Sequence, residues 1–493
     1  MAKKLKFITL DLGAESGRAM LAELGGDRLE LSEVYRFPNR PVRILEHLYW
    51  DVPSLWEEIK AGLAKVATES SKDIAGIGVD TWGVDFGLLD RSGELMGIPH
   101  HYRDSRSHGM LEEAFKRVPR GEIFESTGIQ FMEINSLCQL LSMVREDPKS
   151  LDNVDTFLMI PDLFNYWLTG RKTSEFTIAT TSQCYDPRRK DWARPMLEKM
   201  GIQTRMFLST VDPGTVLGRT LPSLVEETGL TGVPVIAPAC HDTGSAMAAI
   251  PAEGKNFACI SSGTWSIIGT EHPEPVINGG TLQGNFTNEG GVSGMTRLLK
   301  NVAGLWLVQQ CRSTWARGGG NYSYGELTQM ASNAQPFQAI IDPDYGEFLS
   351  PGDMPARIQA YCRATGQGVL EDKGSIIRSI LEGLALKYRL NLERLEQILG
   401  KKLAPLHIVG GGTQNNLLNQ LTADATGRLV LTGPVEATAL GNAIMGALAV
   451  GEIGSLQEGR DLIRRSFPLQ TFEPKSQQKE AWGKAYNKLL SLI

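Results

Sequence analysis

Asp242 is the first residue whose type and position suggest chemistry. It stands in His241-Asp-Thr-Gly244, after an apolar run at 233–240 and before a run of small residues at 245–249. This order predicts that Asp242 lies where a strand ends and a helix begins. Such a position exposes a carboxylate in a crevice and points the helix N-terminus at a bound group. On its own, the residue is also compatible with a simple helix N-cap.

A glycine-bearing turn near the N-terminus is a second candidate. Residues 7–24 read as strand, turn and strand, with Asp11-Leu-Gly-Ala-Glu-Ser-Gly-Arg18 at the bend. Backbone N–H groups around such a turn can converge on phosphate oxygens, and Asp11 can hold a magnesium ion. The segment is neither a Walker loop nor G-x-G-x-x-G, and most glycine-containing hairpins are only hairpins. Glu15 would repel a triphosphate, so we expect its side chain to face away or to reach the metal through water.

Two turns in the second half carry related chemistry. Ser261-Ser-Gly-Thr-Trp-Ser266 joins predicted strands at 257–260 and 265–269, and its hydroxyl and amide donors suit phosphate. Gly410-Gly-Gly412 joins a strand at 406–409 to a helix at 413–426, and bare backbone there lets an adenine ring lie flat. Each turn, taken alone, is equally compatible with binding no ligand. Three such turns facing one cleft favour an enzyme that transfers a phosphoryl group.

A further set of side chains suits a small polyol. Asp80-Thr-Trp-Gly-Val-Asp85 ends a predicted strand at 74–79. The indole of Trp82 is a platform for the apolar face of a sugar ring, although a core position is the commoner fate of a tryptophan. The charged loop at 102–106 either binds hydroxyls or forms a solvated ion pair. His241 is either a hydroxyl ligand or a structural histidine.

The elements that must position these residues belong to an α/β fold. Apolar residues at helical spacing predict a helix over 54–71, with Ser54 as its N-cap. A strand end at 158–160 leads to a short helix at 164–168, which Gly170 closes. A long amphipathic helix is predicted over 376–399, and another helix opens at 434.

Length and composition restrict the class of protein. A chain of 493 residues is too long for one core, so we expect two domains, 1–248 and 249–493. The net charge of −6 (50 − 56), with both signs mixed and no basic stripe, makes nucleic acid an unfavoured partner. Six singly spaced cysteines favour buried thiols in a reducing cytosol over a zinc site. No signal peptide or membrane span is evident, so we expect a cytoplasmic protein.

These motifs together resemble the FGGY carbohydrate kinases along most of the chain. The segments that carry the resemblance are 11–18, 79–86, 102–106, 128–131, 241–243, 261–266, 287–291 and 407–412. The segment 80–86 and the pair His241-Asp242 are the most specific, and they are similar to the branch that acts on L-rhamnulose. The resemblance implies two ribonuclease-H-like domains, of the actin and hexokinase type, around a deep catalytic cleft. The first would bind sugar and carry the first phosphate loop and the catalytic aspartate, and the second would bind nucleotide.

The resemblance also implies roles for particular residues. Asp242 would be the general base that takes the proton of the attacking sugar hydroxyl, and Asp11 would hold Mg2+ directly or through water. The nucleotide contacts would be Ala14, Glu15, Ser16, Gly17, Arg18, Thr264, Gln309 and Gly411. The sugar contacts would be Gly83, His241, Asp242, Thr243 and Asn301, to which the indole argument adds Trp82.

The function expected from this resemblance is ATP-dependent phosphorylation of L-rhamnulose at its 1-hydroxyl. The products would be L-rhamnulose 1-phosphate and ADP, in the breakdown of L-rhamnose. The nearest alternative is a kinase of the same family for another sugar, such as L-fuculose or xylulose. A sugar sensor would need a DNA-binding module, and an actin-like or chaperone-like ATPase would not need a polyol site. We expect ATP, Mg2+ and a sugar as the small-molecule partners, no membrane, and a monomer or small homo-oligomer.

Overall fold

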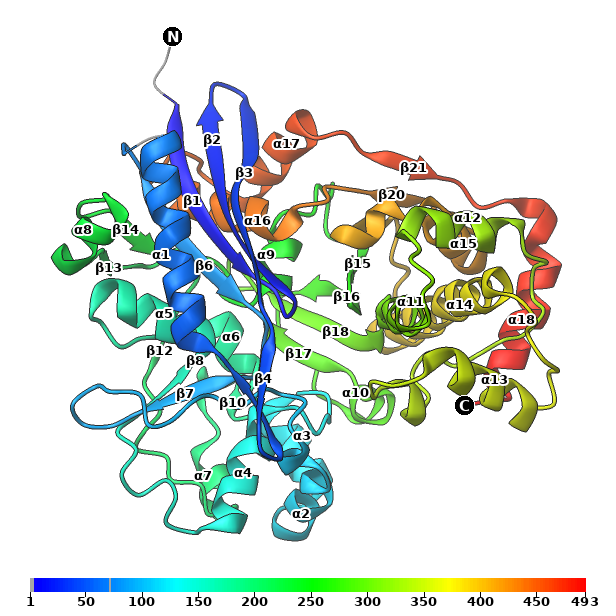
Figure 1. Cartoon of the computed structure of the whole chain (residues 1–493), viewed down its shortest axis with the longest axis horizontal. Helices are drawn as coiled ribbons and strands as arrows, with labels where there is room; N and C mark the ends of the chain where they lie inside the picture. Colours follow the sequence, from blue (N-terminus) through cyan, green and yellow to red (C-terminus); the bar gives the residue numbers. More distant parts are fainter. Residues whose placement is uncertain (1–3, 71) are drawn as a thin grey trace. The chain divides into compact units, whose positions relative to one another are not determined.

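The computed structural model describes residues 4–70 and 72–493. These residues form two compact α/β units, whose elements are labelled in Figure 1. The first unit comprises the described residues of Met1–Pro251 together with Glu271–Leu298 and Ala437–Ser466. The second unit comprises Ala252–Thr270, Leu299–Glu436 and Phe467–Ile493. The units follow packing rather than chain order, so the domain boundary at residue 248 stays a prediction.

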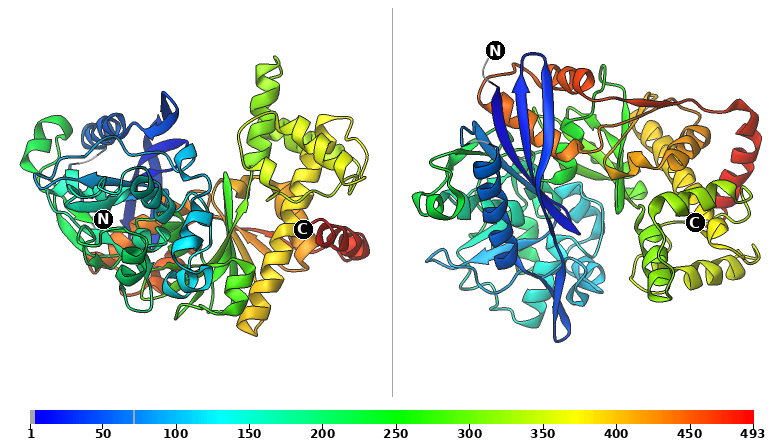
Figure 2. Two further views of the ribbon diagram at one scale, coloured as in Figure 1. Left: turned by 90° about the horizontal axis from the view of Figure 1, so that it is seen from below. Right: turned by 45° about the horizontal axis from the view of Figure 1, so that its top comes forward.

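A six-stranded sheet organises the first unit, in the order β13-β14-β6-β1-β2-β3. Its strands are β1 (Leu5–Leu12), β2 (Ser16–Gly25), β3 (Arg28–Pro38), β6 (Gly76–Thr81), β13 (Val216–Arg219) and β14 (Pro234–Ile236). The first three strands form an antiparallel meander, drawn as adjacent blue arrows in the right-hand view of Figure 2. By contrast, β1, β6 and β14 are parallel, so their carboxyl ends share one edge of the sheet.

The parallel register brings distant parts of the chain together at that edge. Asp11 pairs with Asp80 across β1 and β6, and Thr81 forms a bridge with His241. A Cβ atom on Gly78 would lie 2.1 Å from Oδ1 of Asn442, so the approach of α16 (Ala437–Ala449) to β6 requires glycine there. The sheet therefore delivers two of the predicted chemical residues, Asp11 and His241, to the same place.

The predicted first helix is present, with a different cap. It is α1 (Val52–Glu69), and Leu55, Ile59 and other apolar residues on one face are buried as expected. The N-cap is Asp51, whose carboxylate accepts a hydrogen bond from the Ser54 amide at 3.2 Å. Ser54 as N-cap was therefore wrong, because an aspartate three residues earlier is an equally good acceptor and Pro53 suits the first helical turn.

The remaining elements of the first unit surround this sheet. Its further strands are β4 (Pro41–Ile44), β5 (His47–Trp50), β7 (Phe86–Leu89), β8 (Thr156–Met159), β9 (Ser174–Glu175), β10 (Tyr185–Asp186), β11 (Asp191–Trp192), β12 (Thr210–Val211) and β17 (Thr287–Gly290). Its further helices are α2 (Met110–Arg117), α3 (Arg120–Thr127), α4 (Ser136–Glu146), α5 (Ile160–Thr169), α6 (Phe176–Thr181), α7 (Arg194–Lys199), α8 (Val225–Thr228), α9 (Asp242–Ala248), α10 (Gly279–Gly284) and α17 (Leu456–Ser466). The predicted short helix is α5, and Gly170 ends it in the left-handed region at φ 72°.

A seven-stranded sheet, in the order β17-β18-β16-β15-β19-β20-β21, organises the second unit. Its strands beyond β17 are β15 (Ala258–Ser262), β16 (Trp265–His272), β18 (Thr296–Ala303), β19 (Leu406–Val409), β20 (Val430–Thr432) and β21 (Gln470–Phe472), of which β16 and β18 extend past the unit's limits. The helices are α11 (Trp306–Arg317), α12 (Tyr324–Asn333), α13 (Met354–Ala364), α14 (Lys373–Leu399), α15 (Asn416–Thr426) and α18 (Lys479–Leu490). The hairpin predicted over 257–270 is β15 paired with β16, and the long amphipathic helix is α14.

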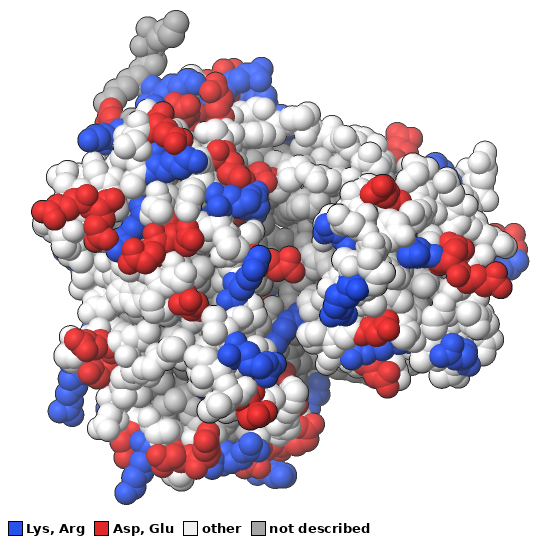
Figure 3. Space-filling view, viewed as in Figure 1, with Lys and Arg blue, Asp and Glu red and all other residues white. Residues whose placement is uncertain are grey.

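Three expectations about the chain as a whole, on its cysteines, its helices and its surface charge, can be compared with the fold. All six cysteines are buried free thiols, as their single spacing predicts. Among the described residues, no helix combines the length and apolar character that crossing a bilayer requires. On the face drawn in Figure 3, cationic and anionic side chains are interspersed.

Candidate active site

Two carboxylates face each other at the carboxyl ends of β1 and β6. Asp11 is buried and forms an ion pair with Arg18, whose Nη2 lies 3.2 Å from Oδ2 of Asp11. Asp80 accepts a hydrogen bond at Oδ2 from the Asn442 amide at 2.6 Å, while its Oδ1 is buried without a hydrogen-bond partner among the described residues. Burial raises the pKa of Asp80 well above its usual value, and the nearby charges of Asp11 and Asp242 raise it further. The sequence reading did not assign Asp80 a role.

Asp242 opens α9 directly after His241, which is the N-cap residue of that helix. Oδ1 of Asp242 accepts hydrogen bonds from the backbone amide and the hydroxyl of Thr243. The Asp242 side chain is 30% exposed, in contrast to Asp11 and Asp80. The predicted helix start at Asp242 is therefore present, whereas the strand β14 ends earlier than predicted, at Ile236, and only an isolated bridge joins His241 to Thr81. The helix start holds a carboxylate that a ligand can reach.

His241 is buried between two carboxylates. Its Nε2 lies 3.4 Å from Oδ1 of Asp242, and its Nδ1 lies 3.1 Å from Oε2 of Glu289 on β17. A Cβ atom on Gly83 would stand 3.3 Å from Nε2 of His241 and 3.3 Å from Oγ1 of Thr181. Gly83 thus leaves open the space beside the imidazole, as a sugar contact at this position needs. Glu289 lies in the segment 287–291, to which the motifs assign no role.

Trp82 is only 5% exposed, and its ring packs against Trp50 at a centroid distance of 4.1 Å, tilted by 34°. Both indoles donate to Oδ2 of Asp85, at 3.0 Å from Trp82 and 2.6 Å from Trp50. Asp85 also accepts from the Tyr102 amide and from Nε2 of Gln139. Burial raises the pKa of Asp85 to about 6 against the opposing effect of these four hydrogen bonds. Trp82 is therefore held rigidly, with its polar edge already satisfied.

The segment predicted to be the first phosphate loop is a tight turn between β1 and β2. The Gly13 amide donates to the Ser16 carbonyl at 3.0 Å, and Asn39 ties the loop to β3 through Gly13 and Glu15. Glu15 is exposed, and a Cβ atom on Gly17 would collide with the Phe37 ring. Residues 14–18 and Asp11 thus lie on the same β1–β2 hairpin, as the sequence predicts.

The predicted nucleotide residues of the second unit also lie together. Nε2 of Gln309, on α11, donates to Oγ1 of Thr264 at 3.1 Å, in the turn between β15 and β16. The turn after β19 packs on the same hairpin, because a Cβ atom on Gly412 would stand 2.0 Å from Oγ of Ser262. A Cβ atom on Gly411 would meet nothing within 4 Å. Asn301 lies on β18, in this second unit, whereas the other predicted sugar residues belong to the first.

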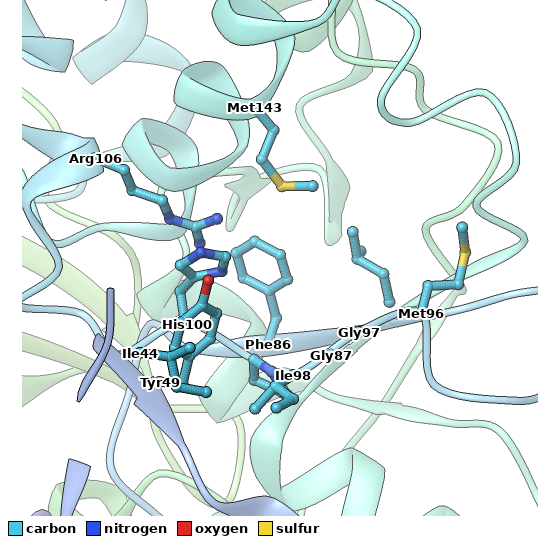
Figure 4. A pocket seen from close by; sticks show the side chains of 12 residues that line it. Ile44, Tyr49, Phe86, Gly87, Met96, Gly97, Ile98, His100, Arg106 and Met143 are labelled. Carbon is cyan, nitrogen blue, oxygen red and sulfur yellow. The ribbon is translucent and has the colours of Figure 1, made fainter. Parts of the chain in front are cut away.

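The charged loop at 102–106 lies against a pocket of about 380 Å³ in the first unit. Figure 4 shows Tyr49, Phe86, His100 and Arg106 around it, and none of the predicted nucleotide, sugar or metal contacts lines it. Arg106 donates to Oε1 of Gln139 at 2.8 Å. The pocket and the Asp85 cluster are therefore connected through Gln139.

One group near this pocket has the composition of a metal site. Ligand atoms of His47, His100 and Asp104 lie within 4.8 Å of one another. Asp104 already accepts hydrogen bonds from the Leu48 and Arg106 amides and lies 3.0 Å from Nδ1 of His47. The arrangement therefore has a sufficient explanation as an anchor for the loop.

Comparison with known proteins places the chain in a family. Residues 6–249 match the N-terminal domain and residues 258–450 the C-terminal domain of the FGGY family of carbohydrate kinases. The chain belongs to this family. It is a sugar kinase, and kinases of this class use ATP as the phosphoryl donor.

Among its relatives are proteins named rhamnulokinase. The chain is 45% identical to that of Bacteroides thetaiotaomicron over 483 residues, which cover 98% of both chains. It is 37% identical to that of Oceanobacillus iheyensis, over 94% of this chain and 97% of the relative.

Solved structures of similar fold include a gluconate kinase from Lactobacillus acidophilus, with TM-score 0.81 and 14% identity, covering 99% of this chain and 98% of that one. A xylulose kinase from the same organism has TM-score 0.80 and 15% identity, over 99% and 97% of the two chains. These structures confirm the predicted two-domain actin and hexokinase-like fold.

Proposed function

We propose that this kinase transfers the γ-phosphoryl group of ATP to the 1-hydroxyl of L-rhamnulose, giving L-rhamnulose 1-phosphate and ADP. The observation that carries the proposal is the accessible Asp242 carboxylate beside His241, in a chain 45% identical to a rhamnulokinase over 98% of its length. The products would enter the breakdown of L-rhamnose. Another FGGY sugar substrate, such as L-fuculose or xylulose, is the alternative.

Asp242 is proposed to act as the general base. Phosphoryl transfer depends mainly on aligning donor and acceptor and on neutralising charge, so one carboxylate that orients the hydroxyl and accepts its proton is enough. Thr243 holds Oδ1 of Asp242 through two hydrogen bonds, and the exposed part of the carboxylate remains available to a hydroxyl. His241 and Gly83 lie beside it, and with Trp82, Thr243 and Asn301 they complete the proposed sugar contacts.

The chain's acidic residues fit a magnesium ion. Asp11 and Asp80 offer carboxylate oxygens, the ligand type that magnesium prefers, and Oδ1 of Asp80 is buried without a hydrogen-bond partner among residues 4–70 and 72–493. Asp11 would hold the ion directly or through water, and Asp80 would support that position. When bound, magnesium neutralises charge on the phosphates. The chain's own part is to keep two carboxylates together with Arg18 against Asp11.

Asp80→Asn should make the protein more stable at neutral pH in the absence of magnesium. Because the folded pKa of Asp80 is raised, the folded state favours its protonated form, and stability is lost as pH rises through that pKa. The variant cannot ionise there, so its advantage in unfolding free energy should grow as the pH rises from the usual pKa of an aspartate through the raised pKa of Asp80. Urea unfolding at several pH values measures this.

Asp90→Asn is the control with opposite sign. Hydrogen bonds from Ser92 and from nearby backbone amides lower the pKa of the partly exposed Asp90, so that variant should lose relative stability as pH rises. A constant or shrinking advantage for Asp80→Asn would contradict the proposed charge crowding at Asp11 and Asp80.

Nucleotide recognition is assigned to the loop at 14–18 and to Thr264, Gln309 and Gly411. Gly411→Ala should raise the KM for ATP about tenfold, equivalent to about 1.4 kcal/mol, while leaving the KM for sugar unchanged. The added methyl group meets no protein atom within 4 Å, so only a ligand lying on the turn would feel it. Steady-state kinetics with each substrate varied in turn measures the effect.

Gly346→Ala is a matched control, since a Cβ atom there also meets nothing within 4 Å in the same unit. It should leave both KM values unchanged. Equal KM values for ATP in the parent and Gly411→Ala would remove Gly411 from the nucleotide site.

Three further expectations accompany the proposal, on the domain division, the location in the cell and the oligomeric state. We place the division between sugar-binding and nucleotide-binding domains near residue 248, close to the end of the N-terminal family match at residue 249. We expect the enzyme in the cytoplasm, as a monomer or small homo-oligomer. Size-exclusion chromatography with light scattering would determine the oligomeric state.

The substrate is tested by ADP release with ATP and magnesium against L-rhamnulose, L-fuculose, xylulose and glycerol. We expect turnover with L-rhamnulose at least about tenfold above the others, a difference of about 1.4 kcal/mol in transition-state binding. Preference for another sugar would keep the kinase assignment and replace the substrate.

A further inference from the structure

The last two residues before Asp242 lie outside the strands of the sheet. β14 ends at Ile236, and α9 begins at Asp242. The Cys240 carbonyl accepts a hydrogen bond from the Thr81 amide at 2.9 Å, at the end of β6. The backbone amides of Cys240 and His241 instead donate to side chains. These side chains therefore help to determine where the helix that carries Asp242 begins.

Two buried side chains at the start of α6 accept these hydrogen bonds. Oε2 of Glu175 accepts from the Cys240 amide at 3.2 Å. Oγ1 of Thr177 accepts from the His241 amide at 3.3 Å and donates to Oε2 of Glu175 at 2.7 Å. The Thr177 and Ile178 amides also donate to Glu175, at 2.9 and 3.0 Å. Because hydrogen bonds to an ionised carboxylate are strong, Glu175 joins the start of α6 firmly to the residues before Asp242.

The same short helix contacts a second part of the proposed sugar site. Oγ1 of Thr181, at the end of α6, accepts from the Val84 amide at 3.1 Å. A Cβ atom on Gly83 would stand 3.3 Å from that hydroxyl oxygen. Two threonine hydroxyls of α6 therefore hold the backbone at two of the predicted sugar contacts, Gly83 and His241.

We propose that Glu175 and Thr177 are positioning residues, which hold the backbone of residues 240 and 241 and so aim the Asp242 carboxylate at the sugar hydroxyl. Phosphoryl transfer depends on alignment, and a displacement of about 1 Å in a reacting group can reduce its rate about 10²-fold. The inference rests on the proposed function for the role of Asp242, but not for the anchoring of the backbone.

The charge of Glu175 is part of this anchor. Burial raises the pKa of Glu175 to about 7, against the opposing effect of its four hydrogen bonds. Asp162 on α5 accepts from the Glu175 amide at 3.1 Å, and burial and the Glu175 charge raise the pKa of Asp162 well above its usual value. Burial also raises the pKa of the Cys240 thiol, the other titratable neighbour, and keeps it neutral. Glu175 is therefore the first of these groups to ionise as the pH rises.

Thr177→Val removes the hydroxyl and keeps the shape of the side chain. It should lower kcat about 10- to 100-fold with little change in the KM for ATP, because Asp242 loses alignment while the nucleotide contacts remain. Thr177→Ser keeps a hydroxyl and should retain kcat within a few-fold. Hydrogen exchange of the free enzyme, followed by mass spectrometry, should be faster in the peptide covering 240–242 in Thr177→Val only.

The pH dependence of kcat tests Glu175 itself. The kcat of the parent should fall as the pH drops through about 7, because a protonated Glu175 is a poorer acceptor for the Cys240 amide. Glu175→Gln cannot ionise, so its kcat should be lower than that of the parent above this pH and should lack the fall. Asp162→Asn should retain the fall, because Asp162 already carries its proton there.

Two variants are matched controls. Oγ1 of the buried Thr220 accepts from the Val233 amide at 3.0 Å, at the opposite end of β14. Thr220→Val should leave kcat and the exchange of residues 240–242 unchanged, even where it lowers stability. Burial also raises the pKa of Glu382 to about 7, in the second unit. Glu382→Gln should therefore retain the fall of kcat with pH.

Unchanged kcat or unchanged exchange in Thr177→Val would overturn the proposal, as would an equal loss of kcat in Thr220→Val. A fall of kcat that persists in Glu175→Gln, or that disappears in Asp162→Asn, would also contradict it.

If neither Thr177→Val nor Glu175→Gln folds, hydrogen exchange of the parent decides. The protection of residues 240–242, corrected for the intrinsic effect of pH on exchange, should fall below about pH 7, and constant protection would overturn the proposal. Failure of the proposed function is distinguishable, because Asp242→Asn would then keep its activity while the exchange results stayed the same.

Discussion

Asp242→Asn should reduce phosphoryl transfer by about 10²- to 10⁴-fold, the usual contribution of a general base. Asparagine keeps the size of the side chain and the hydrogen bond from Thr243, but it cannot accept a proton. Sugar and nucleotide binding, measured by calorimetry, should therefore stay within a few-fold of the parent. ADP release at saturating substrates measures the loss.

The exposed Asp212, which follows β12, provides the control as Asp212→Asn. It should leave kcat unchanged. Full activity in Asp242→Asn would remove Asp242 from its proposed role, and a large loss of sugar binding would make it a ligand for the sugar rather than a base.

The second large effect is expected on stability. Asp85→Leu should lower the free energy of unfolding by about 3–5 kcal/mol, because it leaves buried donors on Trp50, Trp82 and Gln139 without their acceptor. Since Trp82 would also lose its anchor, the KM for sugar should rise in whatever protein remains folded. Urea denaturation of parent and variant measures the stability loss.

Asp90→Ala is the control that separates the effect of burial on stability from the effect of the number of hydrogen bonds lost. Asp90 accepts from the Ser92 amide, the Ser92 hydroxyl and the Glu94 amide, but it lies in an exposed turn. Water can replace its contacts there, so the loss should be much smaller than for Asp85→Leu. Equal losses of unfolding free energy in the two variants would show that burial does not make the Asp85 hydrogen bonds more stabilising than those of Asp90.

Local patterns were sufficient to predict much of the scaffold. The apolar periodicity of α1 and α14, the glycine at the end of α5 and the two glycine-bearing hairpins all depend on residues within one or two turns of each other. The same locality explains the start of α9 at Asp242, which a run of small residues follows. The cap of α1 was missed because Asp51 and Ser54 are both good N-cap residues and sequence alone does not rank them.

The supporting side chains were not predictable because their partners are remote in sequence. Asp80 accepts a hydrogen bond from Asn442, which is 362 residues away. Asp85 accepts from Trp50, 35 residues before it, and from Gln139, 54 residues after it. No periodicity or motif spacing links such positions. The packing of Ala437–Ser466 with the first unit is likewise a tertiary fact that chain order does not reveal.

The central claim is the transfer of phosphate to the 1-hydroxyl of L-rhamnulose with Asp242 as base. Phosphorus and proton NMR of the reaction with L-rhamnulose, ATP and magnesium tests it most directly. The account predicts one sugar phosphate, coupled to the protons on carbon 1 and formed in equal amount with ADP, and almost none with Asp242→Asn. Phosphate on another carbon, inorganic phosphate in place of a sugar ester, or undiminished product with Asp242→Asn would contradict it.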